Sequence, residues 1–211
     1  MKNLLRLLVM LTAVVLPHLW PLPFNTYSLV VLLMVWGFLK MDSDTFANQG
    51  FAFSRFRWRA IPFGLGAAIA IVAFMQLLFF PLLETFIDFP ETRVELYDQL
   101  RGDTAFYILI LIMAWIIGGL YEEIIFHGFI YTQMQKFFKG RYRQGISFLL
   151  TGILFGLYHL QLGPADALNA FVVGMAYHGL ALYFNGNLWY AVFCHGFYNT
   201  IIVSLLYLGY I

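Results

Sequence analysis

Long apolar runs constrain this sequence more than any other feature. They lie at about residues 4–22, 26–39, 60–83, 105–135, 146–160, 164–184 and 188–210. A helix needs about 20 mostly apolar residues to cross a bilayer. Only 11% of the 211 residues are charged, against roughly a quarter in an ordinary soluble domain. The sequence therefore predicts an all-α fold, a polytopic transmembrane helix bundle with about seven crossings.

The few charges are clustered between the apolar segments. Twelve basic and 11 acidic residues give a net charge of +1, so no charge excess indicates a nucleic-acid partner. Basic side chains gather at Arg55–Arg59 and at Lys136–Arg143, whereas residues 84–103 are mainly acidic. Under the positive-inside rule, the basic loops and the N-terminus face the cytoplasm and the acidic loop faces the other side.

Two connecting segments have the composition of the membrane interface. Apolar residues within 90–100 recur near helical spacing with charges between them, which predicts a short interfacial helix. Residues 42–59 mix Phe and Trp with arginines, and we expect either a segment that dips into the headgroups or an ordinary juxtamembrane loop. We divide the chain into N-terminal membrane helices with an interfacial segment (1–104) and core helices (105–211), within one integral membrane domain.

Several polar residues interrupt the apolar segments. An ionisable side chain inside a bilayer is costly, so each needs a partner, a wet cavity or a function. Glu122 and Glu123 lie in the fourth segment, His159 closes the fifth, and His195 and Asn199 lie in the seventh. At about 1.5 Å of rise per residue, Glu122 and the three residues of the later segments lie about 10–21 Å from the basic-loop ends of their helices. They can therefore share one layer inside the bilayer.

Helix geometry also indicates which of these side chains share a face. Glu123 and His127 form an i, i+4 pair, as do His195 and Asn199. The neighbours Glu122 and Glu123 point about 100° apart, so we expect only one glutamate to face a given centre. Small residues allow membrane helices to approach closely, and glycines occur one turn from, or on the face leading to, these polar residues and His178: Gly118, Gly152, Gly156 and Gly174.

A carboxylate, two imidazoles and an amide in one layer have the parts needed for peptide hydrolysis. Glu122 and His159 can form a general-base pair that deprotonates water. His195 and Asn199 can donate hydrogen bonds to the oxyanion that develops on a peptide carbonyl. One carboxylate and two histidines also fit a catalytic zinc site, so the sequence leaves zinc open. We favour catalysis without a metal because the side chains come from separate helices.

The same residues form three motifs: Glu122-Glu123-x-x-x-His127, Phe155-x-x-x-His159 and His195-x-x-x-Asn199. They resemble the motifs of the CAAX protease and bacteriocin-processing family, also called CPBP or Abi, of glutamic-type intramembrane proteases. The family motifs are Glu-Glu-x-x-x-Arg, Phe-x-x-x-His and His-x-x-x-Asn or Asp, in that order. The resemblance covers roughly residues 105–205, and it departs from the family at His127, where arginine is usual.

The resemblance implies about eight mostly helical membrane segments with a four-helix catalytic core. Glu122 and His159 would activate water, and His195 and Asn199 would stabilise the oxyanion. Glu123 and His127 would form a supporting pair, weaker and more pH-dependent than a glutamate–arginine pair. No cofactor is expected, and zinc stays open as the alternative that we do not favour.

The implied function is an intramembrane endopeptidase that hydrolyses a peptide bond of a membrane-anchored or lipidated substrate, for example in processing C-terminal sorting anchors. Its partners would be that protein or peptide substrate and the lipid bilayer, without nucleic acid. Its location would be a bacterial inner membrane, with the N-terminus in the cytoplasm. Two alternatives stay open: a non-catalytic membrane immunity or partner protein, and a proton-coupled transporter in which the same side chains relay protons.

Overall fold

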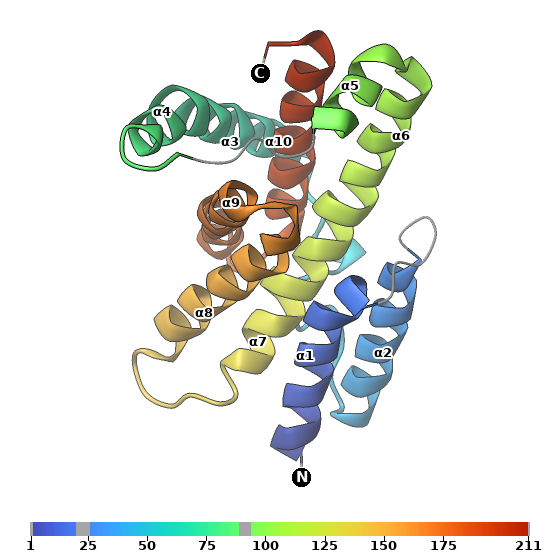
Figure 1. Ribbon diagram of the computed structural model, residues 1–211. Coiled ribbons are helices and arrows are strands. Elements are labelled where there is room, and N and C mark those ends of the chain that lie inside the picture. The colour runs from blue at the N-terminus through green and yellow to red at the C-terminus, as the bar shows by residue number, and fades with distance from the viewer. Residues whose placement is uncertain (1, 20–25, 89–93, 211) are drawn as a thin grey trace.

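The structure is a computed structural model, and it describes residues 2–19, 26–88 and 94–210 (Figure 1). The fold is 81% helical and contains no strand among the described residues. The predicted fold class, an all-α helical bundle, is confirmed.

The helices follow the predicted apolar segments closely. Two of them are continuous rods with a wider, π-type stretch inside: α3 (Ala60–Phe74) runs through η3 (Met75–Phe79) into α4 (Phe80–Glu84), and α6 (Thr104–Met113) runs through η4 (Ala114–Ile130) into α7 (Tyr131–Met134). The other helices are α1 (Lys2–Leu19), α2 (Tyr27–Met41), α5 (Val94–Gly102), α8 (Arg143–Tyr158), α9 (Pro164–Tyr183) and α10 (Leu188–Leu208). Short 3-10 turns are η2 (Phe53–Arg55) and η5 (Leu160–Leu162).

Within the described residues, five helical stretches are long and apolar enough to cross a membrane. They are Lys2–Leu19, Ala60–Glu84, Thr104–Met134, Arg143–Leu162 and Leu188–Leu208. The apolar helix α2 has only 15 residues, and α9 is not among the five although it has 20. The seven predicted segments are thus helical over most of their described residues, whereas crossing by α2 and α9 stays a prediction.

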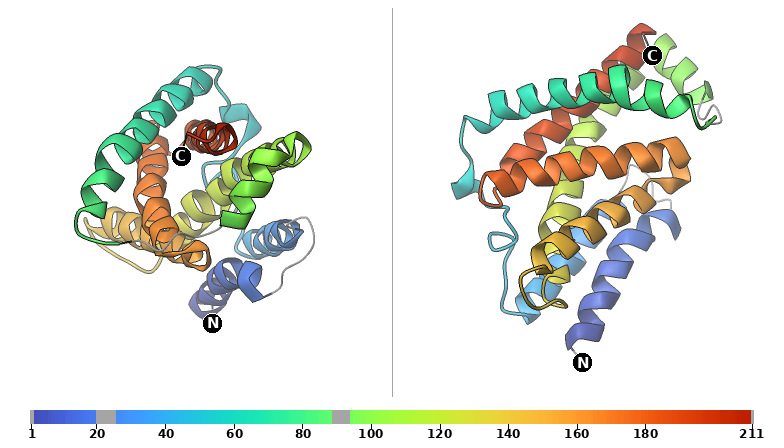
Figure 2. Two further views of the ribbon diagram at one scale, coloured as in Figure 1. Left: turned by 45° about the horizontal axis from the view of Figure 1, so that its top comes forward. Right: turned by 90° about the vertical axis from the view of Figure 1, so that its left-hand side faces the viewer.

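The α6–η4–α7 rod organises the bundle (Figure 1). Helices α1 and α2 pack side by side; α2 contacts η4, and α1 contacts α8. Helices α9 and α3–α4 run across the rod, as the views in Figure 2 show, and α10 packs on α3, on η4 and on α9. Helix α8 packs along α9. Side chains of the rod and of α10 therefore point toward the space that α8 and α9 bound.

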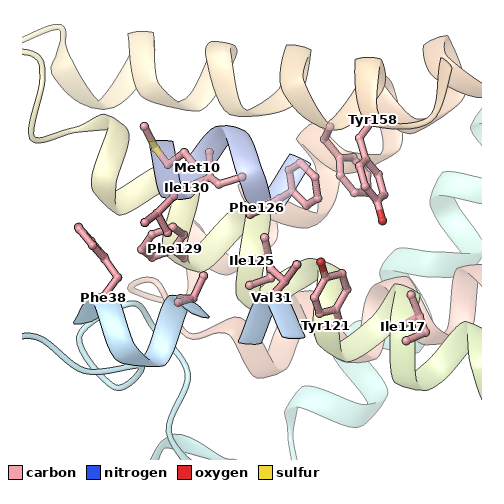
Figure 3. Packing of buried hydrophobic residues seen from close by; sticks show 14 of the residues in the cluster. Met10, Val31, Phe38, Ile117, Tyr121, Ile125, Phe126, Phe129, Ile130 and Tyr158 are labelled. Carbon is pink, nitrogen blue, oxygen red and sulfur yellow. The ribbon is translucent and has the colours of Figure 1, made fainter. Parts of the chain in front are cut away.

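An apolar core fixes the N-terminal helices to the rod. Figure 3 shows side chains from α1, α2, η4 and α8 packed together, among them Met10, Val31, Phe38, Phe126, Phe129 and Tyr158. Lipid tails are as apolar as these side chains, so close packing rather than exclusion of water holds such helices together.

Helices α8 and α9 meet through glycines. A Cβ on Gly156 would lie 2.9 Å from the carbonyl oxygen of Ala167, and a Cβ on Gly174 would collide with the ring of Phe155. The close approach expected at these glycines is therefore confirmed. It places the Phe155 ring deep between the two helices.

A polar cluster that the sequence did not predict joins α1, α7 and the end of α2. The buried Arg6 donates hydrogen bonds of 2.8 Å to Gln133 Oε1, Asp42 Oδ2 and Asn3 Oδ1. Lys136 Nζ lies 3.1 Å from carboxylate oxygens of both Asp42 and Asp44. We call these residues the helix-end cluster: Asn3, Arg6, Asp42, Asp44, Gln133 and Lys136.

The two segments assigned to the membrane interface are partly accounted for. The predicted helix at 90–100 corresponds to α5, and its residues before Val94 lie outside the described residues. In the 42–59 loop, Arg55 donates to the carbonyl oxygens of Asn185 and Gly186 at 2.7 and 3.1 Å, while Phe53 and Trp58 are exposed. The contact of either segment with lipid headgroups stays a prediction.

Candidate active site

Both glutamates lie on the wide stretch η4. In this stretch the backbone is wound as a π-helix, with i→i+5 hydrogen bonds, a form that occurs frequently at functional sites. Glu122 and Glu123 are both buried, and Glu123 is completely inaccessible, with 0% exposure. A completely buried carboxylate needs hydrogen-bond donors around it, and histidines supply them here.

His159 faces Glu122 from the end of α8. Its Nδ1 lies 2.8 Å from the carbonyl oxygen of Phe155, so Nδ1 carries a proton that it donates. Its Nε2 lies 3.8 Å from Glu122 Oε2, beyond hydrogen-bond range. In neutral His159, Nε2 therefore presents a lone pair beside the carboxylate of Glu122.

His195 lies between the two glutamates. Its Nδ1 is 2.9 Å from Glu123 Oε1, and its Nε2 is 4.0 Å from Glu122 Oε2. The expectation that only one glutamate faces a given centre was wrong. The physical reason is that a single imidazole presents nitrogens on two edges, so one ring contacts carboxylates that point in different directions.

The predicted contact between Glu123 and His127 is present. His127 Nδ1 lies 2.9 Å from Glu123 Oε2, so the two oxygens of Glu123 bind two different imidazoles. The ring of His178 stacks on His127 with 4.9 Å between centroids and 12° between planes. We call Glu122, Glu123, His127, His159 and His195 the buried centre.

Asn199 lies on the same side of α10 as His195 and against Gly118 of η4. A Cβ added to Gly118 would lie 2.5 Å from Asn199 Nδ2 and 3.2 Å from His195 Nε2. Gly118 is one turn before Glu122, so the lack of a side chain there leaves room for the amide and the imidazole beside the carboxylate. The structure thus brings Glu122, His159, His195 and Asn199 into the one layer predicted from their depths.

Aromatic rings hold the histidines in place. The centroid of the Phe155 ring lies 4.7 Å from that of His159 and 5.3 Å from that of His127. Tyr177, which the sequence did not single out, stacks on His195 at 4.5 Å with 22° between the planes. The sequence offered one signal for Tyr177, which is its position directly before His178. Because adjacent residues of a helix point in different directions, that position did not indicate a contact with His195.

Metal binding was left open by the sequence. Among the residues that the structure describes, no group of three or more His, Cys, Asp or Glu side chains is arranged to hold a metal ion. Glu122, His159 and His195 remain the side chains through which zinc would be tested. Catalysis without a metal stays a prediction.

Comparison with known proteins agrees with this geometry. Residues 104–201, which include all three motifs, match the family model described as "Type II CAAX prenyl endopeptidase Rce1-like". Residues 104–201 are thus similar to the Rce1-like family. The five apolar helical stretches and the similarity to the Rce1-like family identify the chain as an integral membrane protein.

One relative and the solved structures complete the comparison. An uncharacterized protein of Mycoplasma capricolum subsp. capricolum is 30% identical over 102 residues, which are 48% of this chain and 28% of that protein. The chain thus spans little more than a quarter of that relative's length. No solved structure matches.

Proposed function

We propose that this protein is an intramembrane endopeptidase that hydrolyses a peptide bond with water activated by Glu122 and His159. The observation that carries the proposal is the 3.8 Å separation of His159 Nε2 from Glu122 Oε2, with His159 Nδ1 already bonded to the backbone. The Rce1-like match supports the same class of reaction.

The separation fits one water molecule held by two acceptors. Because Glu122 Oε2 and neutral His159 Nε2 both accept, a water beside them can donate one hydrogen to each. The lone pairs of that water then point away from the pair, toward a substrate carbonyl. Glu122 takes a proton as the water oxygen bonds to the carbonyl carbon. That proton passes to the leaving nitrogen when the C–N bond breaks, so the products are a carboxylic acid and an amine.

His195 and Asn199 are proposed to stabilise the oxyanion. Because Glu123 accepts from His195 Nδ1, a doubly protonated His195 has its charge balanced by a buried carboxylate 2.9 Å away. Its Nε2–H and the amide of Asn199 then donate to the oxygen that becomes negative in the tetrahedral intermediate. Donors that are already oriented need no rearrangement during the reaction, which is why such a site accelerates it.

The proposed substrate is membrane-anchored or lipidated. His159 and Asn199 are half-buried in a bundle whose outer surface is apolar, so a peptide bond close to a membrane anchor reaches them without leaving the bilayer region. C-terminal sorting anchors are one such substrate. We place the protein in a bacterial inner membrane with a cytoplasmic N-terminus, supported by the basic residues Arg55–Arg59 and Lys136–Arg143.

The first experiment compares the termini of membrane proteins in native cells that carry the wild type or Glu122→Gln. Terminal-peptide mass spectrometry should find new termini with the wild type alone, and these termini identify the substrate. Identical sets of termini, with both proteins well expressed, would overturn the proposal in favour of a non-catalytic partner or a transporter. Adding a zinc chelator to the same assay tests metal dependence, and we expect cleavage to continue.

A further inference from the structure

A polar cavity adjoins the buried centre at His127. Its volume is about 140 Å³, and its wall includes His127, His178, Arg55 and the amides of Asn48, Gln49 and Asn185. It adjoins a larger hollow of about 640 Å³, with which it shares Tyr131, Leu182, Asn185 and Gly186. The smaller cavity thus connects two buried histidines to a wider opening at the ends of α7, α8 and α9.

The two histidines that line the cavity each have an unsatisfied nitrogen. His127 is 3% exposed and His178 is 1% exposed, and within the described part of the chain the Nε2 atom of each has no hydrogen-bond partner. Buried polar atoms normally bond to protein or to ordered water. A water molecule occupies about 30 Å³ in the liquid, so a cavity of this size and polarity holds several. Water in the cavity is therefore the natural partner for these nitrogens.

On its other edge, His127 is connected to the rest of the buried centre. Its Nδ1 binds Glu123 Oε2 at 2.9 Å, and Glu123 Oε1 binds His195 Nδ1 at 2.9 Å. Glu123 carries at most one negative charge, so His127 and His195 compete for the same buried counter-ion. A change of charge on His127 is thus felt at His195 through two short hydrogen bonds.

We propose that His127 is a positioning residue that sets the charge and orientation of His195 through Glu123, and that it exchanges protons with water in the polar cavity. In the exchange, a hydronium ion gives one proton to His127 Nε2 and becomes water. His178 covers the ring of His127 and leaves its edge toward the cavity. The effect on catalysis rests on the proposed function, whereas the proton exchange is measured without a substrate.

Other charged and titratable groups near His127 come from every element around it. They are Glu123 on η4, His195 on α10, His178 on α9, Tyr131 on α7, Arg55 in the cavity wall, and Arg143 of α8 close to Tyr131. Of these, Glu123 alone bonds directly to His127. The assay therefore follows the histidine rings individually.

The test uses the full chain in lipid nanodiscs, with histidine ring signals recorded by NMR between about pH 5 and 8. We expect the ring signals of His127 and His195 to shift together over this range. In His127→Gln the shift of the His195 signal should be lost. In His127→Arg, which keeps a permanent charge beside Glu123, the shift of the His195 signal should be lost as well. Signals of His127 and His195 that shift independently, or a His195 signal unchanged by both variants, would overturn the proposal.

A second variant tests the route without altering a histidine. Gly179 lines the larger hollow, and a Cβ there meets nothing within 4 Å, so Gly179→Leu should block the opening. Gly66→Leu is the matched control, because Gly66 also has nothing within 4 Å of a Cβ and lies on α3. We expect Gly179→Leu alone to slow exchange of the His127 ring proton with water. Equal exchange in both variants would exclude the cavity as the route.

The kinetic readout separates this inference from the proposed function. The pH profile of cleavage should show an ionisation in the wild type that is absent from His127→Gln and His127→Arg. A merely structural role would lower the rate at every pH and leave the profile's shape unchanged. If neither the wild type nor any variant cleaves a substrate, but the ring signals of His127 and His195 still shift together, the proposed function fails. The coupling between the two histidines then stands.

Discussion

The long α6–η4–α7 rod carries two polar groups that are built in opposite ways. At its end, Arg6 of the helix-end cluster makes three hydrogen bonds of 2.8 Å, and Lys136 reaches two carboxylates. In its middle, Glu122 stands 3.8 Å from His159 and 4.0 Å from His195, and His127 Nε2 has no partner among the described residues. The first group is saturated, whereas the second leaves acceptors and space for another molecule.

This difference separates a structural role from a chemical one. A saturated polar cluster fixes helices relative to one another and has no spare capacity to bind a ligand. Carboxylates and imidazoles held close together but beyond bonding distance keep lone pairs free for a water or a substrate. We therefore expect changes in the buried centre to alter activity and changes in the helix-end cluster to alter stability.

The largest effect is expected from His159→Gln. Loss of the acceptor nitrogen beside Glu122 should lower the cleavage rate about 100- to 10,000-fold, the range for general acid–base groups. His159 is half-buried, so the unfolding temperature should change little. His18→Gln is the matched control, because His18 contacts Tyr158 and Gln161 next to His159 but lies outside the centre. Equal losses in both variants would contradict the assignment.

Gly118→Ala should act on the side of the centre where we propose that the oxyanion is stabilised. Its Cβ would lie 2.5 Å from Asn199 Nδ2, so the amide must move. Displacement of a catalytic group by about 1 Å can cost about 100-fold in rate, and we expect a loss of that order in kcat. Gly37→Ala, where a Cβ meets nothing within 4 Å, should retain the wild-type rate. Full activity in Gly118→Ala would remove Asn199 from the site.

Arg6→Met tests the opposite half of the comparison. Gln133 and Asp42 would lose a charged donor, which should cost about 2 kcal/mol of unfolding free energy while the cleavage rate per folded molecule stays unchanged. Thermal unfolding in detergent and the cleavage assay measure the two quantities. Lys2→Met is the control: Lys2 Nζ is 3.8 Å from Asp42, but the side chain is 83% exposed, so little stability should be lost.

Acid should weaken the helix-end cluster. Burial raises the pKa of Asp42, but hydrogen bonds from Arg6 and Lys136 outweigh it and hold the pKa below its ordinary value of 3.8. Because the folded-state pKa is the lower one, this stabilisation is present above pH 3.8 and is lost as the pH falls through the folded value. Unfolding temperatures from pH 6 downward should show this acid-dependent loss in the wild type and a smaller one in Asp42→Asn. Equal acid sensitivity would contradict a role for Asp42.

Much of the fold followed from the sequence because helices in a bilayer must be apolar and of a certain length. The predicted segments 26–39 and 188–210 correspond to Tyr27–Met41 and Leu188–Leu208. A tight turn joins α9 and α10 at Asn185-Gly186, with positive φ angles of 56° and 66°. The crossing angles of α9 and α3–α4 were not predictable, because they depend on which surfaces pack and not on hydropathy.

The candidate site followed from depth and spacing, since rise per residue and helix faces are properties of any α-helix. These rules failed where contacts come from other helices. They did not predict that His195 bonds to Glu123 while facing Glu122, that Tyr177 stacks on His195, or that Arg6 is buried against Gln133. The π-helical backbone of η4 was not predicted either, because the depths and faces were derived from α-helical spacing.

The most direct test of the central claim is the cleavage rate of purified wild type and Glu122→Gln in lipid vesicles, on the substrate identified from the termini. Both proteins should have the same unfolding temperature, and the variant should cleave at least about 100-fold more slowly. A variant that cleaves at the wild-type rate would contradict the account, because the buried centre would then not contain the base that activates water.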